Sequence, residues 1–146
     1  MIEYIHGDLF KTDIQIIVHG CNCLGGFGAG IAYHVAKNYP EAKPEYVKLC
    51  KSFAGKPEQL LGTFQTVQSN DKIIINAFTQ LTYGGPGRKV SYDAMTTIFE
   101  NLDQKYAGKE IALPKIGSDL GGGSWDIIEK IIDSSCKRVT PVVYYL

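Results

Sequence analysis

The sequence predicts an α/β fold, a three-layer sandwich in which helices cover both faces of a mixed, mainly parallel sheet of about six strands. Strand-like apolar runs alternate along the chain with segments of helical periodicity, and this alternation is typical of parallel sheets. The 146 residues contain no internal repeat, low-complexity tract or linker. They fit one domain that can bury a proper core, so we expect a single domain over residues 1–146.

Six segments are expected to form the strands of this sheet. Ile14–His19 and Lys72–Phe78 are nearly continuously apolar. Such runs are typical of central strands, which are buried on both faces of a parallel sheet. The other expected strands, two with alternating polar and apolar residues and two that are short, are Ile2–His6, Gly62–Val67, Ile111–Pro114 and Pro141–Tyr145.

Four segments show the apolar periodicity of helices. Pro40 is expected to stop the first of them, and Gly108 is expected to end the third. Ser91 and Ser124 stand just before the third and fourth segments, where a serine side chain can cap the first turn. The expected helices are Gly30–Tyr39, Pro44–Ser52, Tyr92–Tyr106 and Trp125–Ser134.

Charge and cysteine spacing exclude several classes of protein. The formal net charge is zero, which is not expected of a surface that binds duplex nucleic acid. No apolar run approaches the length of a membrane span, and the N-terminus does not resemble a signal peptide, so we expect no membrane partner and a cytoplasmic location, or a nuclear one in a eukaryote. The cysteines and histidines lack the spacing of metal ligands. The protein is therefore expected to contain no metal and no cofactor, and to be a monomer.

The chemistry is expected at two glycine-rich junctions between a strand and a helix. The first, residues 18–31, contains four glycines and one alanine in six residues, and the second is Lys115–Gly123. Small residues allow backbone N–H groups to approach an anion, and the helix N-terminus adds partial positive charge. Because ligands bind outside the carboxyl ends of the strands, the two loops predict a cleft for a diphosphate. The alternative is that each loop only connects two elements.

Four motifs occur in a specific order along the chain. They are Gly7–Phe10, His19–Cys23 together with Gly28–Ile31, Asn76–Gln80 and Leu113–Ser118. In this order and spacing they resemble the macrodomains, a family of ADP-ribose-binding modules, over essentially the whole chain. Residues 19–42 look most like the yeast-type ADP-ribose 1″-phosphate phosphatases. Those enzymes hydrolyse the monoester phosphate of ADP-ribose 1″-phosphate, which is a by-product of tRNA splicing.

The resemblance implies a role for each matching residue. Asp8 would accept a hydrogen bond from the adenine amine, with Leu9 beside the base. Asn22, next to Cys21, would contact the distal ribose. Phe78 and Thr79 would line the floor of the cleft. The two loops would enclose the diphosphate through Gly28, Ala29, Gly30 and Ile31 on one side and Ile116, Gly117, Ser118, Asp119, Leu120 and Gly121 on the other.

The expected catalytic residues of such a phosphatase are His19, Asn22 and Asp119. His19 closes the predicted central strand, and the ordinary histidine pKa of about 6.5 suits proton transfer at neutral pH. Its alternative is a core histidine that is hydrogen-bonded to backbone. Asp119 is expected to orient or deprotonate water, and its alternative is a capping role for the helix at Ser124.

Two other functions remain open at this stage. Related macrodomains that remove ADP-ribose from glutamate or from DNA carry a lysine where this chain has Gln80, which disfavours lysine-dependent hydrolysis here. A non-catalytic reader of ADP-ribose needs only the cleft. The expected partners are small-molecule ADP-ribose derivatives, with nucleic acid only as an ADP-ribosylated substrate.

Overall fold

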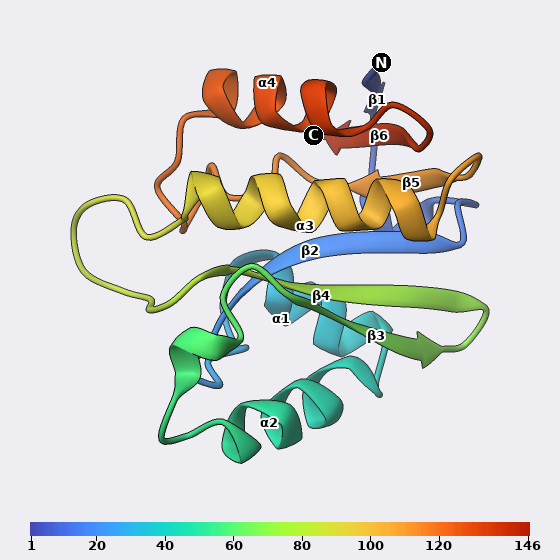
Figure 1. Ribbon diagram of the computed structural model, residues 1–146. Helices are drawn as coiled ribbons and strands as arrows, with labels where there is room; N and C mark the ends of the chain where they lie inside the picture. The colour runs from blue at the N-terminus through green and yellow to red at the C-terminus, as the bar shows by residue number, and fades with distance from the viewer.

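The computed structural model describes residues 1–146 and contains one six-stranded sheet with the strand order β1-β6-β5-β2-β4-β3 (Figure 1). Every neighbouring pair is parallel except β3 and β4, which are antiparallel. The predicted mixed, mainly parallel sheet is therefore confirmed. The strands are β1 (Glu3–His6), β2 (Ile16–Asn22), β3 (Phe64–Ser69), β4 (Lys72–Gln80), β5 (Glu110–Leu113) and β6 (Thr140–Tyr145).

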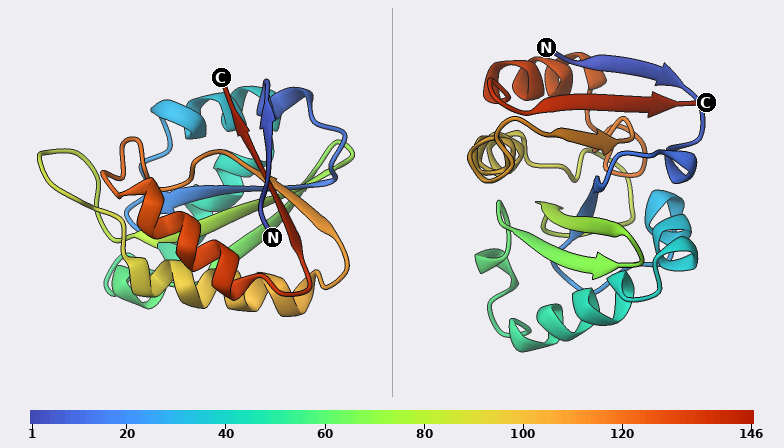
Figure 2. Two further views of the ribbon diagram at one scale, coloured as in Figure 1. Left: turned by 90° about the horizontal axis from the view of Figure 1, so that it is seen from above. Right: turned by 90° about the vertical axis from the view of Figure 1, so that its right-hand side faces the viewer.

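Four α-helices and two short 3₁₀ turns complete the fold. The turns are Leu9–Lys11 and Pro57–Gln59. Both views in Figure 2 show α1 and α3 on opposite sides of the sheet, as the predicted three-layer arrangement requires. None of the helices is long and apolar enough to cross a membrane. The helices are α1 (Gly30–Asn38), α2 (Ala42–Ser52), α3 (Tyr92–Lys105) and α4 (Trp125–Ser135).

The central strand β2 is buried on both faces because two separate hydrophobic clusters pack against it. Ile16 and Val18 belong to the cluster beneath α3 and α4, whereas Ile17 and Cys21 belong to the cluster beneath α1 and α2. This division follows from the alternation of side chains along a strand. The strand is thus fixed from both sides, and so is the loop that follows it.

Two strands extend further toward the cavity than the sequence predicts. β2 continues to Asn22 rather than ending at His19, and β4 continues to Gln80 rather than ending at Phe78. The two strands pair in parallel over this extension, with Asn22 opposite Gln80. Consequently, residues expected at the ends of strands lie inside the sheet, and this displacement decides which side chains reach the site.

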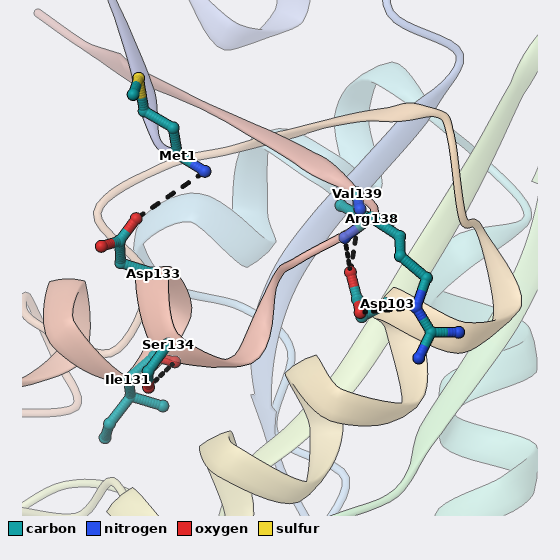
Figure 3. Close-up of polar contacts among 7 residues, drawn as sticks. All are labelled: Met1, Asp103, Ile131, Asp133, Ser134, Arg138 and Val139. Atoms are coloured by element: carbon teal, nitrogen blue, oxygen red, sulfur yellow. Dashed lines mark hydrogen bonds and ion pairs between the residues drawn. The ribbon is translucent and has the colours of Figure 1, made fainter.

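Asp103 at the end of α3 anchors the turn that leads into β6 (Figure 3). Its Oδ1 accepts hydrogen bonds from the backbone N–H groups of Arg138 (2.7 Å) and Val139 (2.9 Å). The Arg138 Nε lies 3.7 Å from the other carboxylate oxygen. Burial by itself would raise the pKa of this carboxyl group, but the N–H donors and the guanidinium outweigh burial and lower the pKa.

Candidate functional site

A cavity of about 900 Å³ opens at the edge of the sheet where the parallel strands end. This volume is at the upper end of the range for ligand pockets, about 300–1,000 Å³. All the predicted ligand-binding residues line the cavity except Phe78, and of the predicted catalytic residues only His19 is missing from its walls. The structure thus brings together the segments that the sequence placed at one site.

The two glycine-rich loops meet at this cavity. A Cβ atom added to Gly30 in the first loop would lie 3.0 Å from Cδ1 of Leu120 in the second. The backbone of Gly30 has a φ of +59°, a conformation that favours glycine. Glycine at this position therefore allows both the turn into α1 and the contact between the loops.

Backbone N–H groups in both loops have no acceptor within the protein. They include those of Gly28 and Ala29 just before α1, and those of Asp119 and Leu120 in the second loop. Unpaired donors next to a helix N-terminus form a site for anions. Apart from Gly28 itself and its two chain neighbours, no residue has a heavy atom within 4 Å of the place where a Cβ on Gly28 would stand, so the backbone there is open. The arrangement can bind a diphosphate through backbone N–H groups, and Lys37 and Lys115 also line the cavity.

Asn22 shapes the first loop with its side-chain amide. The Oδ1 atom accepts hydrogen bonds from the backbone N–H groups of Leu24 (2.9 Å) and Gly26 (3.1 Å) and from the Tyr46 hydroxyl (2.9 Å). The Nδ2 atom donates to the Gly26 carbonyl at 2.7 Å. Because an amide carries two N–H bonds, one donor of Asn22 remains available at the cavity wall.

His19 lies in the core, which contradicts the expectation that its side chain reaches the cleft. It is fully buried, and its Nε2 lies 2.6 Å from Oδ1 of Asn76. The Asn76 Nδ2 donates to the Ala42 carbonyl and to Gln65, so Oδ1 faces His19 and Nε2 carries the proton. Burial lowers the His19 pKa to about 4, although the hydrogen bond to Asn76 opposes the shift. The alternative of a core histidine is the correct one, with a side-chain partner in place of a backbone partner.

Phe78 also lies in the core rather than on the cavity floor. It is fully buried and its ring stacks on that of Tyr46, with centroids 5.9 Å apart. The next residue, Thr79, does line the cavity, but its buried hydroxyl has no hydrogen-bond partner. A Cβ at Gly20 would lie 2.7 Å from that hydroxyl oxygen, so glycine is required beside it.

Asp8 caps a turn beside the cavity and keeps one carboxylate oxygen unpaired. Its Oδ1 accepts a 2.9 Å hydrogen bond from the Phe10 N–H and thereby caps the first 3₁₀ turn. The second carboxylate oxygen has no partner within the protein, and the residue lines the cavity. Capping therefore fixes the carboxylate in place while one oxygen stays free for a ligand donor.

Asp119 does not cap α4, so this alternative is wrong. Ser124 occupies the position before α4 without a side-chain hydrogen bond, whereas Ser91 does cap α3 through the Ala94 N–H. The Asp119 side chain is exposed on the wall of the cavity and makes no hydrogen bond or ion pair in the protein. It and Asp8 are the two acidic side chains that line the cavity.

The two cysteines near the cavity are protonated thiols at neutral pH. Burial raises the pKa of Cys21 well above its ordinary value and raises that of Cys23 to about 12. The Cys23 thiol also donates to the Gln80 carbonyl at 3.4 Å. A cysteine side chain acts as a nucleophile in its thiolate form. Because both thiols stay protonated, the structure favours a packing role for Cys21 and Cys23.

The family model for the Macro domain matches residues 18–132, which include both glycine-rich loops. The chain belongs to the macrodomain family.

Among the relatives of this macrodomain, the ADP-ribose 1″-phosphate phosphatase of Meyerozyma guilliermondii is 39% identical, covering 90% of this chain and 91% of that protein. The DNA ADP-ribosyl glycohydrolase of Mycobacterium tuberculosis is 29% identical over 97% of this chain, which corresponds to 40% of the relative's length. The structure of the DarG macrodomain of M. tuberculosis superimposes with a TM-score of 0.82 at 28% identity and covers 100% of this chain and 98% of that one.

Sequence reasoning assigned no ligand contact to several residues that line the macrodomain's cavity, and Gln80 and Tyr83 are among them. Gln80 ends β4, and its Nε2 donates to the Thr82 carbonyl at 2.8 Å. Tyr83 follows in a loop whose glycines suggest only a turn. The signal that could have found both is the pairing of β4 with β2, which carries the segment after β4 to the same edge as the first glycine-rich loop.

Proposed function

We propose that this macrodomain is a phosphatase that hydrolyses ADP-ribose 1″-phosphate to ADP-ribose and phosphate. The observation that carries the proposal is the set of unpaired N–H groups in two facing loops, which suits the diphosphate of the ligand. The names of the yeast relatives support this choice of substrate. The free oxygen of Asp8 would accept a hydrogen bond from the adenine amine.

Asp119 is the residue best placed to assist the reaction. Its side chain is free of protein partners, and it belongs to the loop that would enclose the diphosphate. In the proposed step, Asp119 orients a water and accepts its proton. The water oxygen bonds to phosphorus while the bond from phosphorus to the ribose oxygen breaks. The departing ribose oxygen takes a proton from the protonated Asp119 carboxyl or from water and becomes the hydroxyl of ADP-ribose, and the phosphate is released. Phosphoryl transfer depends mainly on positioning and on charge stabilisation, which the backbone donors would supply.

His19 has no part in this proposal. Its imidazole is buried, it is hydrogen-bonded to Asn76, and its pKa of about 4 keeps it neutral at physiological pH. A group that transfers a proton must lie within hydrogen-bond reach of the reacting atoms, directly or through one water. Because His19 is not on the cavity wall, we assign the proton transfer that was predicted for it to Asp119 instead.

A second candidate is removal of ADP-ribose from a macromolecule, favoured by the likeness to the M. tuberculosis glycohydrolase. Gln80 argues against it, because its neutral amide is held by the Thr82 carbonyl and lacks the charge and basicity of a lysine amine.

The test is a panel of ADP-ribose 1″-phosphate and of glutamate-, serine- and thymidine-linked ADP-ribose, assayed with and without EDTA. We expect phosphate release that EDTA does not abolish. Release of ADP-ribose from a linked substrate, with no phosphatase activity, would support the second candidate instead.

A further inference from the structure

The loop of residues 81–90 joins the two glycine-rich loops at one end of the cavity. At its start, the Leu81 carbonyl accepts a 3.2 Å hydrogen bond from the Cys23 N–H. At its end, the N–H groups of Lys89 and Val90 both donate to the Gly121 carbonyl, at 2.8 and 3.1 Å. The loop is therefore fastened to both walls and forms a third wall between them.

Tyr83 is the large side chain with which this loop reaches the cavity. Its ring lies directly over the backbone of Gly26, because an added Cβ there would stand 2.9 Å from Tyr83 Cε2. The same Cβ would stand 3.1 Å from the Asn22 Nδ2, so Tyr83 and Asn22 are neighbours on one side of Gly26. Tyr83 remains 56% exposed and lines the cavity. Tyr83 thus covers the cavity where the free donor of Asn22 lies.

This covered end is remote from Asp8. Asp8 follows β1, Tyr83 follows β4, and three strands separate these two in the sheet. Strands that lie about 4.8 Å apart place the two strand ends roughly 19 Å from each other. A nucleotide whose base is held at Asp8 would accordingly extend along the loops toward Tyr83, with its distal ribose at the covered end.

We propose that Tyr83 is a specificity-determining residue that limits the size of the group attached to the distal ribose. The inference rests on the proposed function, since it assumes ADP-ribose in that orientation. In this arrangement the Tyr83 ring, which stands beside Gly26 and Asn22, is the side chain that a peptide or nucleotide chain on the distal ribose would meet on its way out of the cavity, whereas a single phosphate would not need to pass it. Tyr83 therefore selects a small-molecule ester over ADP-ribose that is linked to a macromolecule.

The test compares the wild type with Tyr83→Ala and with Tyr83→Phe, which keeps the ring as a matched control. Calorimetry gives the affinities for ADP-ribose and for a peptide that carries one serine-linked ADP-ribose, and their ratio is the readout. We expect the wild type to prefer free ADP-ribose at least ~10-fold, which corresponds to ~1.4 kcal/mol. Tyr83→Ala should reduce that preference to within about 3-fold, or ~0.6 kcal/mol, and Tyr83→Phe should retain it.

A preference that Tyr83→Ala leaves unchanged would overturn the inference, and so would equal affinities in the wild type. Phosphate release from ADP-ribose 1″-phosphate is measured on the same wild-type sample. Absence of phosphate release would contradict the proposed function. The ratio of the two binding affinities would still decide the role of Tyr83. The two failures are therefore distinguishable.

Discussion

The His19 Nε2 and the Asn76 Oδ1 lie 2.6 Å apart and join the two central strands β2 and β4 inside the protein. Asn76 is itself held by the Ala42 carbonyl at the start of α2 and by Gln65 of β3. The pair thus connects the sheet to the helical layer beneath the first glycine-rich loop, and its role is structural.

The first prediction concerns the pH dependence that His19 gives to stability. The folded pKa of about 4 lies below the unfolded value of about 6.5, so the unfolded chain takes up the proton first as the pH falls. The contribution of neutral His19 to the free energy of unfolding is fully present above pH ~6.5. It is lost progressively as the pH falls toward ~4, and the total loss is ~3 kcal/mol. Urea unfolding across this range should show the loss in the wild type and much less of it in His19→Gln. Equal pH profiles would contradict the pKa assigned to His19.

The second prediction concerns Asp103. Asp103→Ala leaves the part-buried N–H of Arg138 and the buried N–H of Val139 without an acceptor and should destabilise the protein by about 1–3 kcal/mol. The control is Asp133→Ala, which removes only an exposed contact with the N-terminus and should cost about 0–1 kcal/mol. Denaturant midpoints measure both variants. Similar losses in the two would show that the Asp103 anchor adds no more than a surface ion pair.

The third prediction concerns the unpaired hydroxyl of Thr79. Thr79→Val keeps the shape of the side chain and removes a buried polar atom that has no partner, so the ligand-free protein should gain about 1 kcal/mol. Thr12→Val is the matched control with the opposite sign, because the Thr12 hydroxyl pairs with Tyr144 and accepts the Ile14 N–H. Thermal unfolding should separate the two variants, and destabilisation by Thr79→Val would show that its hydroxyl is satisfied.

The fourth prediction concerns the open backbone of Gly28. Gly28→Glu should abolish ADP-ribose binding in a folded protein, because the side chain enters free space in the cavity and brings a negative charge to the diphosphate. Gly55→Glu places the same charge at an equally open glycine outside the cavity and should bind normally. Calorimetry compares the two variants. Normal binding by a folded Gly28→Glu protein would mean that the first loop is only a connector.

The sequence was sufficient for the order of the elements and for most of the cavity wall, because apolar periodicity and glycine-rich junctions are local signals. It was insufficient to place the side chains of His19 and Phe78, because each residue was expected at the end of its strand and therefore at the cavity. The pairing of β2 with β4 carries both strands further, so Asn22 and Gln80 end them instead. The length of a paired strand depends on its partner, and that information is not local.

The position of Tyr83 at the cavity could not be predicted from the sequence for a related reason. Its loop is glycine-rich, and nothing in the local sequence distinguishes it from a simple turn. The loop is fastened at the cavity by hydrogen bonds to Cys23 and Gly121, which are distant from it in sequence.

The central claim, a phosphatase assisted by Asp119 and independent of His19, is tested most directly by the rate of phosphate release from ADP-ribose 1″-phosphate. We predict measurable release by the wild type and a kcat lower by about 10²–10⁴ in Asp119→Asn, the range for loss of a general acid or base. His19→Gln, assayed at a pH where it is folded, should retain a kcat within a few-fold of the wild type. No release by a wild-type protein that binds ADP-ribose would contradict the claim, as would a large loss in His19→Gln with none in Asp119→Asn.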